Sequence, residues 1–211
     1  MGDLSTGPEV IDDFILIKSD GYPTYNFAHI IDDLEMGVTH IMRADEFIAS
    51  TPKFLSLYEA LAITPPVFVT LPPILAPEGN KKLGKRDGAK DILEYRKEGY
   101  LPEAMMNFLA FLGWNPGGDV EIMSPQEIVE HFSIDRIHKA GAMLNAEKLL
   151  WMNKEHMRKR PSEEQKAAIK QYLGDAFPDD MLTRLVPTII DRINVYGELI
   201  SIKDEEFGFF V

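Results

Sequence analysis

The chain has 211 residues, 45% of them hydrophobic, and a net charge of −12 at pH 7. Such a length allows one large domain or two small ones with a sizeable core. The acidic balance argues against a general nucleic-acid-binding surface, and we expect no DNA partner. No cysteine is present, which excludes disulfides and thiolate metal sites. Without a long apolar stretch or a secretory signal, no membrane partner is expected and a cytoplasmic protein fits.

The N-terminal part alternates between strand and helix patterns. Apolar runs predict strands at residues 10–18, 38–42 and 67–71. Helical spacing of apolar residues predicts a helix over residues 24–36, closed by Gly37, and a second helix beginning at Ser50-Thr51-Pro52. Strand and helix in alternation predict an α/β fold with a parallel sheet and crossover helices.

A long loop over residues 72–88, rich in proline, glycine and lysine, interrupts this pattern. Loops of this length inside a compact domain are often functional. Beyond the loop no strong strand pattern remains, and we expect helices at residues 89–98, 102–112, 124–131, 145–158, 162–173 and 178–195. The sequence therefore predicts an α/β domain over residues 1–95, followed by an all-α domain over residues 96–211.

Two basic clusters stand out on this acidic chain. One contains Lys81, Lys82, Lys85, Arg86, Lys90, Arg96 and Lys97; the other contains Lys148, Lys154, His156, Arg158, Lys159 and Arg160. The second cluster is equally consistent with a solvated charged face. The first includes residues 81–88, in which four of the eight residues are basic and glycines lie within and after the cluster. Ammonium groups on a flexible backbone can follow a polyphosphate during reaction, although a surface lysine-rich turn would look similar.

Several motifs together indicate a family. Lys82-Leu83-Gly84-Lys85-Arg86 resembles the Lys-Met-Ser-Lys-Arg signature of class I aminoacyl-tRNA synthetases. Further segments resemble the glutamate-specific branch, at residues 19–28, 38–47, 50–53, 99–104, 108–114 and 144–153. They agree in order and spacing over roughly residues 10–160, which is far more specific than the lysine loop alone. By this resemblance the chain is identified as a member of the glutamyl-tRNA synthetase family.

The resemblance implies a fold and a reaction. The fold would be the second half of a Rossmann-type catalytic domain, followed by a helical domain that contacts tRNA. The family activates L-glutamate with ATP to glutamyl-adenylate and transfers the glutamate to tRNA(Glu). Mg²⁺ would accompany the ATP, bridging phosphate oxygens with few protein ligands, and no zinc or other protein-bound metal is expected.

The resemblance also assigns site residues. Those expected to bind the substrate glutamate are Tyr25, His29 and Arg43. Those expected to bind ATP are Glu46, Leu75, Lys82, Lys85 and Arg86, with Lys82 and Lys85 as the catalytic lysines. An arginine fork suits a carboxylate, and its place at a parallel strand's C-terminal end suits ligand binding.

Each assignment has a structural alternative. Tyr25 could be a core aromatic, Arg43 could pair with Asp32, Asp33 or Glu46, and Glu46 could be a surface charge. Two positions also depart from the family pattern, since His29 replaces a usual asparagine and Gly84 replaces a usual serine. A neutral histidine can still donate one hydrogen bond, but it titrates near neutrality.

Other family features are absent from this sequence. No His-Ile-Gly-His motif occurs in it, and we expect that the chain stops at Gly208-Phe209-Phe210-Val211 before any anticodon-binding domain. We therefore interpret the chain as a fragment that is inactive alone, with an incomplete sheet whose edge is exposed. Rival hypotheses are a glutaminyl-tRNA synthetase, a tRNA-modifying glutamyl-adenylate enzyme, and a non-catalytic tRNA- or protein-binding module.

Overall fold

The computed structural model describes residues 7, 11–77, 79, 81–84, 90–174 and 176–205. The chain forms two compact units, Met1–Pro73 and Ile74–Val211. This division falls before the boundary expected at residues 95/96, because the strand that follows Pro73 pairs within the helical part of the chain. The expected roles of residues 1–95 and 96–211, as catalytic and tRNA-contacting domains, stay predictions.

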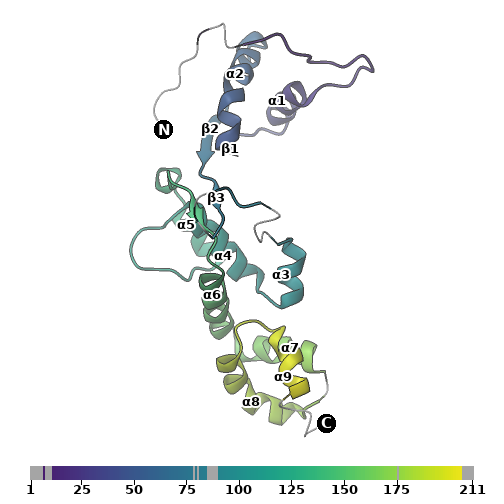
Figure 1. The fold of residues 1–211 in the computed structure, drawn as a ribbon, viewed down its shortest axis with the longest axis vertical. Helices are drawn as coiled ribbons and strands as arrows, with labels where there is room; N and C mark the ends of the chain where they lie inside the picture. Colours follow the sequence, from purple (N-terminus) through teal and green to yellow (C-terminus); the bar gives the residue numbers. More distant parts are fainter. Residues whose placement is uncertain are drawn as a thin grey trace. The chain divides into compact units, whose positions relative to one another are not determined.

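The first unit has a helix–strand–helix–strand order (Figure 1). Its elements are α1 (Tyr25–Glu35), β1 (His40–Ala44), the 3-10 helix η2 (Asp45–Ser50), α2 (Thr51–Ala60) and β2 (Val67–Leu71). Strands β1 and β2 are parallel, with Arg43 opposite Thr70, which confirms the predicted parallel pairing with a helical crossover. Gly37 adopts a left-handed backbone with φ of +67° directly after α1, as its expected capping role requires.

A small core joins the two helices of this unit to its sheet. Ile30 of α1 and Phe54, Leu57 and Tyr58 of α2 are buried, and Phe68 of β2 packs against them. The spacing of Phe54, Leu57 and Tyr58 along α2 places all three on one helix face. This core fixes α1 beside the carboxyl half of β1, where the candidate site lies.

The strand expected at residues 10–18 is wrong for the part that the structure describes. Residues 11–18 form no strand there, and the segment makes only one isolated bridge, between Ile17 and Pro23. Two residues of this apolar run, Phe14 and Leu16, pack against the core of the unit. An apolar run therefore indicated burial correctly but not the backbone pairing that a strand needs.

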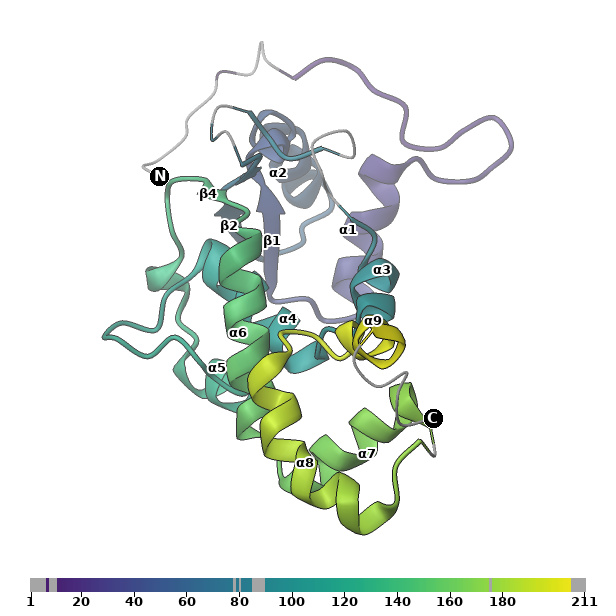
Figure 2. The same cartoon turned by 60° about the horizontal axis from the view of Figure 1, so that its bottom comes forward.

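The second unit contains two short strands and seven α-helices in its described part (Figures 1 and 2). They are β3 (Ile74–Leu75), α3 (Ile92–Glu98), α4 (Pro102–Gly113), α5 (Pro125–His131), the 3-10 helix η4 (Ile134–Arg136), β4 (Ala142–Met143), α6 (Ala146–Lys159), α7 (Ser162–Leu173), α8 (Asp179–Arg192) and α9 (Glu198–Glu205). The six expected helices are present. The parallel pair β3–β4 and the helix α9 were not expected.

Two apolar clusters hold this unit together. One lies between α4 and α6 and includes Phe108, Leu112 and Met152. The other joins α7, α8 and α9 to the start of α4, with Val186 and Leu199 completely buried. Among the described residues, no helix has both the length and the apolar character needed to cross a bilayer.

Candidate functional site

The expected glutamate-binding residues of the first unit come together. Tyr25 and His29 lie one turn apart on α1, with ring centroids 5.0 Å apart. Arg43 of β1 places its guanidinium 6.0 Å from the centre of the Tyr25 ring. Since α1 packs on the same core as the β1–β2 sheet, the fold brings an arginine, a histidine and a tyrosine to one place.

Phenylalanine side chains support this group. The guanidinium of Arg43 lies 5.2 Å from the centre of the Phe47 ring and 5.6 Å from that of Phe54. The edge of Phe54 also meets the ring of His29, with centroids 4.5 Å apart. Stacked aromatic faces hold an arginine in place and attract its charge without neutralising it.

Within the described part of the chain, Arg43 makes no ion pair with Asp32, Asp33 or Glu46, and Asp33 pairs with His29 instead. Its Nη1 atom is buried and has no hydrogen-bond partner among those residues. Buried polar atoms almost always have a partner, and an unpaired one costs about 1–3 kcal/mol. The arrangement therefore favours an arginine kept for an external carboxylate over the structural ion pair that the sequence left open.

Asp33 instead contacts His29. The Nδ1 atom of His29 lies 3.4 Å from Oδ2 of Asp33, one turn further along α1. Burial lowers the pKa of His29, the hydrogen bond to Asp33 raises it, and the charge of Arg43 lowers it again; the net direction is down. His29 is therefore neutral over a wider pH range than a free histidine, and its Nε2 atom is buried without a partner among the described residues.

The exposed members of the site show where a substrate could approach. Tyr25 is 57% exposed, so it is not the core aromatic that the sequence allowed as an alternative. A cavity of about 20 Å³ borders Arg43, Phe47 and Phe54 and has room for about one water molecule. A glutamate molecule would therefore contact this group from the open side, at Tyr25, and not from within that cavity.

Glu46 lies exposed in η2, in the first turn after β1. Among the described residues, the polar and ring contacts of Tyr25, His29 and Arg43 do not include Glu46. It does have an interaction partner, so the simple surface charge allowed by the sequence does not describe it fully. Its expected contact with the ATP ribose stays a prediction.

The expected ATP-binding segment begins in the second unit with a small hairpin. Leu75 of β3 pairs antiparallel with Lys82, and the amides of Ala76 and Leu83 donate to Lys81 and Ile74 at 2.9 and 2.8 Å. On its other side, Leu75 accepts a hydrogen bond from the amide of Leu144 at 3.2 Å. The lysine loop therefore starts from a strand fixed on both sides, where the sequence predicted only loop.

Lys82 is exposed at the end of this hairpin. Lys85 and Arg86 lie outside the described residues, so their expected phosphate contacts stay predictions. The carbonyl oxygen of Leu75 is already used by Leu144, although a carbonyl can accept a second hydrogen bond. The hairpin thus supports an ordered start for the lysine loop, which a solvated lysine-rich turn would not need.

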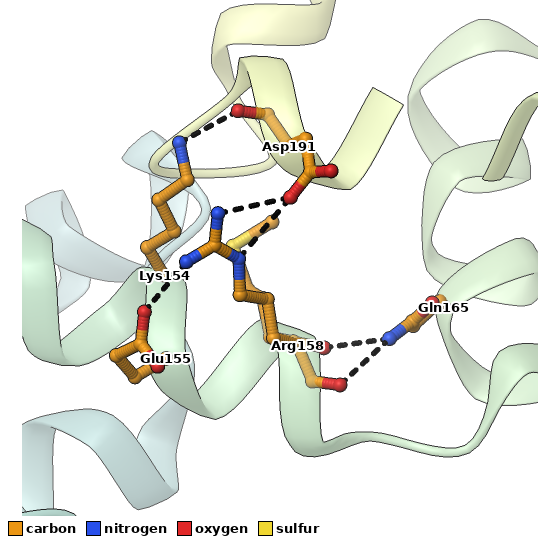
Figure 3. A network of polar contacts seen from close by, with 6 residues as sticks. Lys154, Glu155, Arg158, Gln165 and Asp191 are labelled. Carbon is orange, nitrogen blue, oxygen red and sulfur yellow. Dashed lines mark hydrogen bonds and ion pairs between the residues drawn. The ribbon is translucent and has the colours of Figure 1, made fainter. Parts of the chain in front are cut away.

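The second basic cluster is held by contacts within the chain (Figure 3). Lys154 donates to the backbone carbonyl of Asp191 at 2.7 Å, and Arg158 contacts the carboxylates of Glu155 and Asp191 at 2.8 and 2.9 Å. Lys148 and Arg160 pair with Glu121 and Glu103, each at 2.7 Å, while Lys159 donates to the carbonyl of Ile122 at 3.2 Å and His156 is buried. These contacts favour a structural surface over a phosphate-binding one.

A larger hollow of about 550 Å³ lies between α3 and α4. Apolar and aromatic side chains line most of it, among them Leu93, Tyr100 and Met105, and none of the expected site residues borders it.

The model for tRNA synthetases class I (E and Q), catalytic domain, matches residues 1–151. The chain belongs to this family. The match runs across the boundary expected at residues 95/96 and covers both candidate segments. The letters E and Q denote glutamate and glutamine, so the glutamyl branch is one of the two that the model describes.

Curated relatives that the chain resembles are glutamate–tRNA ligases. A glutamate–tRNA ligase from Clostridium botulinum is 40% identical over 210 residues, covering 99% of this chain and 42% of the relative. Another from Moorella thermoacetica is 49% identical over 157 residues, covering 74% of this chain and 32% of the relative. The chain therefore spans less than half the length of these ligases.

A solved structure supports the same fold. The glutamate tRNA ligase from Elizabethkingia meningosepticum, described in complex with its amino acid, matches with a TM-score of 0.84 and 36% identity. The alignment covers 94% of this chain and 43% of that structure. The fold is accordingly that of a class I synthetase catalytic domain with many helices.

Sequence reasoning about this ligase homologue missed three residues of the site. Asp33 was considered only as a partner for Arg43, although its spacing of four from His29 places the two on one helix face. Phe47 and Phe54 gave no signal at all, because an aromatic residue at helical spacing indicates a core position. Only the tertiary structure shows that both rings meet Arg43.

Proposed function

We propose that the chain is the part of a glutamate–tRNA ligase that binds L-glutamate and ATP and carries the phosphate-binding lysines. The complete reaction is ATP-dependent formation of glutamyl-adenylate, followed by transfer of glutamate to tRNA(Glu). The observation that carries this proposal is the guanidinium of Arg43. Its buried Nη1 atom has no hydrogen-bond partner among the described residues, and the guanidinium lies against the rings of Tyr25, Phe47 and Phe54.

In this proposal Arg43 binds a carboxylate of glutamate, because its planar fork can donate two parallel hydrogen bonds. The hydroxyl of Tyr25, on the exposed side of the group, donates to the same substrate. Lys82 and Lys85 hold the phosphates of ATP and stabilise charge on the leaving pyrophosphate, with Arg86 beside them. The backbone of Leu75 contacts the adenine and Glu46 contacts the ribose. Mg²⁺ would accompany the ATP and help to neutralise charge on its phosphates.

The test is glutamate-dependent ATP–pyrophosphate exchange. It is measured on the chain alone and on the chain joined to the N-terminal His-Ile-Gly-His half expected of the family, each with and without tRNA. We expect exchange only in the joined protein. If neither protein catalyses exchange but tRNA still binds, the result would instead favour a non-catalytic binding module derived from a synthetase.

Replacing Arg43 with lysine is expected to raise the KM for glutamate in the joined protein by about 100-fold, or roughly 3 kcal/mol, because a lysine cannot make the bidentate contact. The KM for ATP should stay within about twofold, since Arg43 does not touch the nucleotide in this proposal. Exchange assays at varied glutamate and varied ATP separate the two. Arg184, an exposed arginine of α8, provides the control Arg184→Lys.

An equal rise in both KM values would contradict the assignment of Arg43 to glutamate, because it would indicate a general disturbance of the fold. An unchanged glutamate KM would show that the guanidinium has a structural role only. In either case the proposed substrate contact would have to move to another residue.

Replacing Lys154 and Arg158 together with alanine is expected to weaken tRNA binding by less than about threefold. Both side chains are already paired with groups of their own chain, at Asp191 and Glu155. The affinity for tRNA is measured at several salt concentrations. A large loss with a shallower salt dependence would instead show that this surface contacts phosphates, since each lost phosphate contact reduces the slope by about one.

A further inference from the structure

His29 offers a ligand one nitrogen that the protein does not use. Its side chain is 9% exposed, Nδ1 faces Asp33, and Nε2 is buried without a partner among the described residues. A carboxylate can only accept a hydrogen bond, so the proton of the neutral ring lies on Nδ1 and a lone pair occupies Nε2.

The charges around His29 are balanced before any substrate binds. The groups that face it are Asp33 and Tyr25 on α1, Arg43 on β1 and, through the same core, Tyr58 on α2. Asp33 carries one negative charge and Arg43 one positive charge, and burial raises the pKa of Tyr58, which keeps that phenol neutral at physiological pH. A neutral His29 fits this set.

A substrate carboxylate at Arg43 changes that balance. It adds a negative charge to a half-buried group, and it brings oxygen lone pairs toward the lone pair of Nε2. Both Arg43 and His29 lie against the rings of Tyr25 and Phe54, so a ligand on one is close to the other. A proton on Nε2 would remove the repulsion, restore neutrality and supply a further hydrogen bond.

Resting on the proposed glutamate site, we infer that binding of the substrate carboxylate places a proton from solvent on Nε2 of His29, and that Asp33 is the positioning residue that holds Nδ1–H while this happens. No other bond forms or breaks. Nε2 is buried in the free chain, so a side-chain motion has to open it to the ligand, and such motions are fast. The family's usual asparagine would donate from its amide at this position with no proton uptake.

The consequence is a pH dependence of substrate affinity with a defined sign. In the free chain the pKa of His29 is below its usual value, and a bound carboxylate raises it. Between these two pKa values binding takes up a proton, so affinity rises as the pH falls, by up to about tenfold per pH unit. Below the pKa of the free chain and above that of the complex, the affinity levels off.

The experiment is an NMR titration of the chain with L-glutamate at pH 6, 7 and 8, in the unmodified chain and in the variants His29→Asn and Asp33→Asn. The two carboxylates of glutamate stay ionised throughout this range. We expect the dissociation constant of the unmodified chain to fall several-fold from pH 8 to pH 6, and the His29 ring to gain its second proton on binding. His29→Asn should bind with a constant that does not change with pH, and Asp33→Asn should flatten the dependence.

His40, an exposed histidine at the start of β1, gives the matched control. His40→Asn should leave the pH dependence as it is. Equal affinity at pH 6 and pH 8 in the unmodified chain, with His29 neutral in the complex, overturns the inference while the glutamate site stands. Absence of glutamate binding in both the unmodified chain and His29→Asn, at every pH, overturns the inference, while exchange in the joined protein decides whether the glutamate site stands.

Discussion

Replacing Gly99 with alanine is expected to destabilise the second unit by about 3 kcal/mol or more. Gly99 ends α3 with φ of +86°, a conformation that strains any residue with a side chain. A Cβ atom there would lie 2.4 Å from the amide nitrogen of Gly197 and 3.0 Å from that of Tyr196. These are backbone atoms, so the clash cannot be relieved by turning a side chain.

The backbone of this turn is also bound to the segment that it crosses. The amide of Tyr196 donates to the carbonyl of Gly99 at 3.3 Å, and the amide of Gly197 donates to that of Glu98 at 3.2 Å. Any shift that makes room for a methyl group therefore breaks hydrogen bonds between the end of α3 and the start of α9. Urea unfolding followed by circular dichroism measures the loss.

Two other glycines separate the causes. Gly118 has φ of +73° but nothing within 4 Å of its Cβ position, so Gly118→Ala should cost only the backbone strain, about 1 kcal/mol. Gly113, in the last turn of α4, has ordinary φ and open space, so Gly113→Ala should be neutral or stabilise by up to about 1 kcal/mol. If Gly99→Ala lowers the free energy of unfolding by no more than Gly118→Ala does, the close approach of the Gly197 and Tyr196 backbone does not contribute to the loss.

Helices were predictable from the sequence because each carries its own signal. Pro102 at the start of α4 and the capping box of Ser124 and Glu127 at the start of α5 mark helix ends within a few residues. The β3–β4 pair carried no such signal, since a strand of two residues is too short to show alternation. Pairing between residues distant in sequence depends on the tertiary fold, which is also why the apolar run at residues 10–18 was wrongly assigned to a strand.

The candidate site shows the same limit. Motif resemblance selected Tyr25, His29 and Arg43, and the structure confirms that they come together. The sequence did not show which carboxylate contacts His29 or Arg43, because Asp32, Asp33 and Glu46 are all near these residues along the chain. The basic cluster of α6 was ambiguous for a similar reason: its acidic partners Glu103 and Asp191 are far away in sequence.

Replacing Asn153 with leucine is expected to lower the free energy of unfolding of the second unit by about 2–4 kcal/mol. Asn153 lies on α6 and is completely buried. Its Oδ1 atom accepts from the amide of Leu101 at 2.8 Å, and its Nδ2 atom donates to the carbonyl of Asn194 at 2.6 Å. Leucine has a similar size but would leave both backbone groups buried without a partner, at about 1–3 kcal/mol each.

Asn145, the N-cap of the same helix, gives a matched comparison. Its side chain accepts from the amide of Lys148 at 2.9 Å at an exposed position, so water can replace it and Asn145→Ala should cost about 1 kcal/mol. Unfolding by urea ranks the two variants. A loss at Asn153→Leu no larger than at Asn145→Ala would show that the buried amide is not needed to join these segments.

Asn153 and Gly99 both help to hold residues 98–101 against residues 194–197, so the stability losses of their variants should depend on each other. Residues 98–101 and residues 194–197 are joined directly by the backbone contacts of Gly99 and indirectly through the amide of Asn153. Once one connection is broken, the two segments can separate enough to relieve the other. The double variant Gly99→Ala/Asn153→Leu should therefore lose less stability than the sum of the single variants, by about 1 kcal/mol or more, in a double-mutant cycle. Additive losses would mean that α3, α6 and α9 are held by independent contacts.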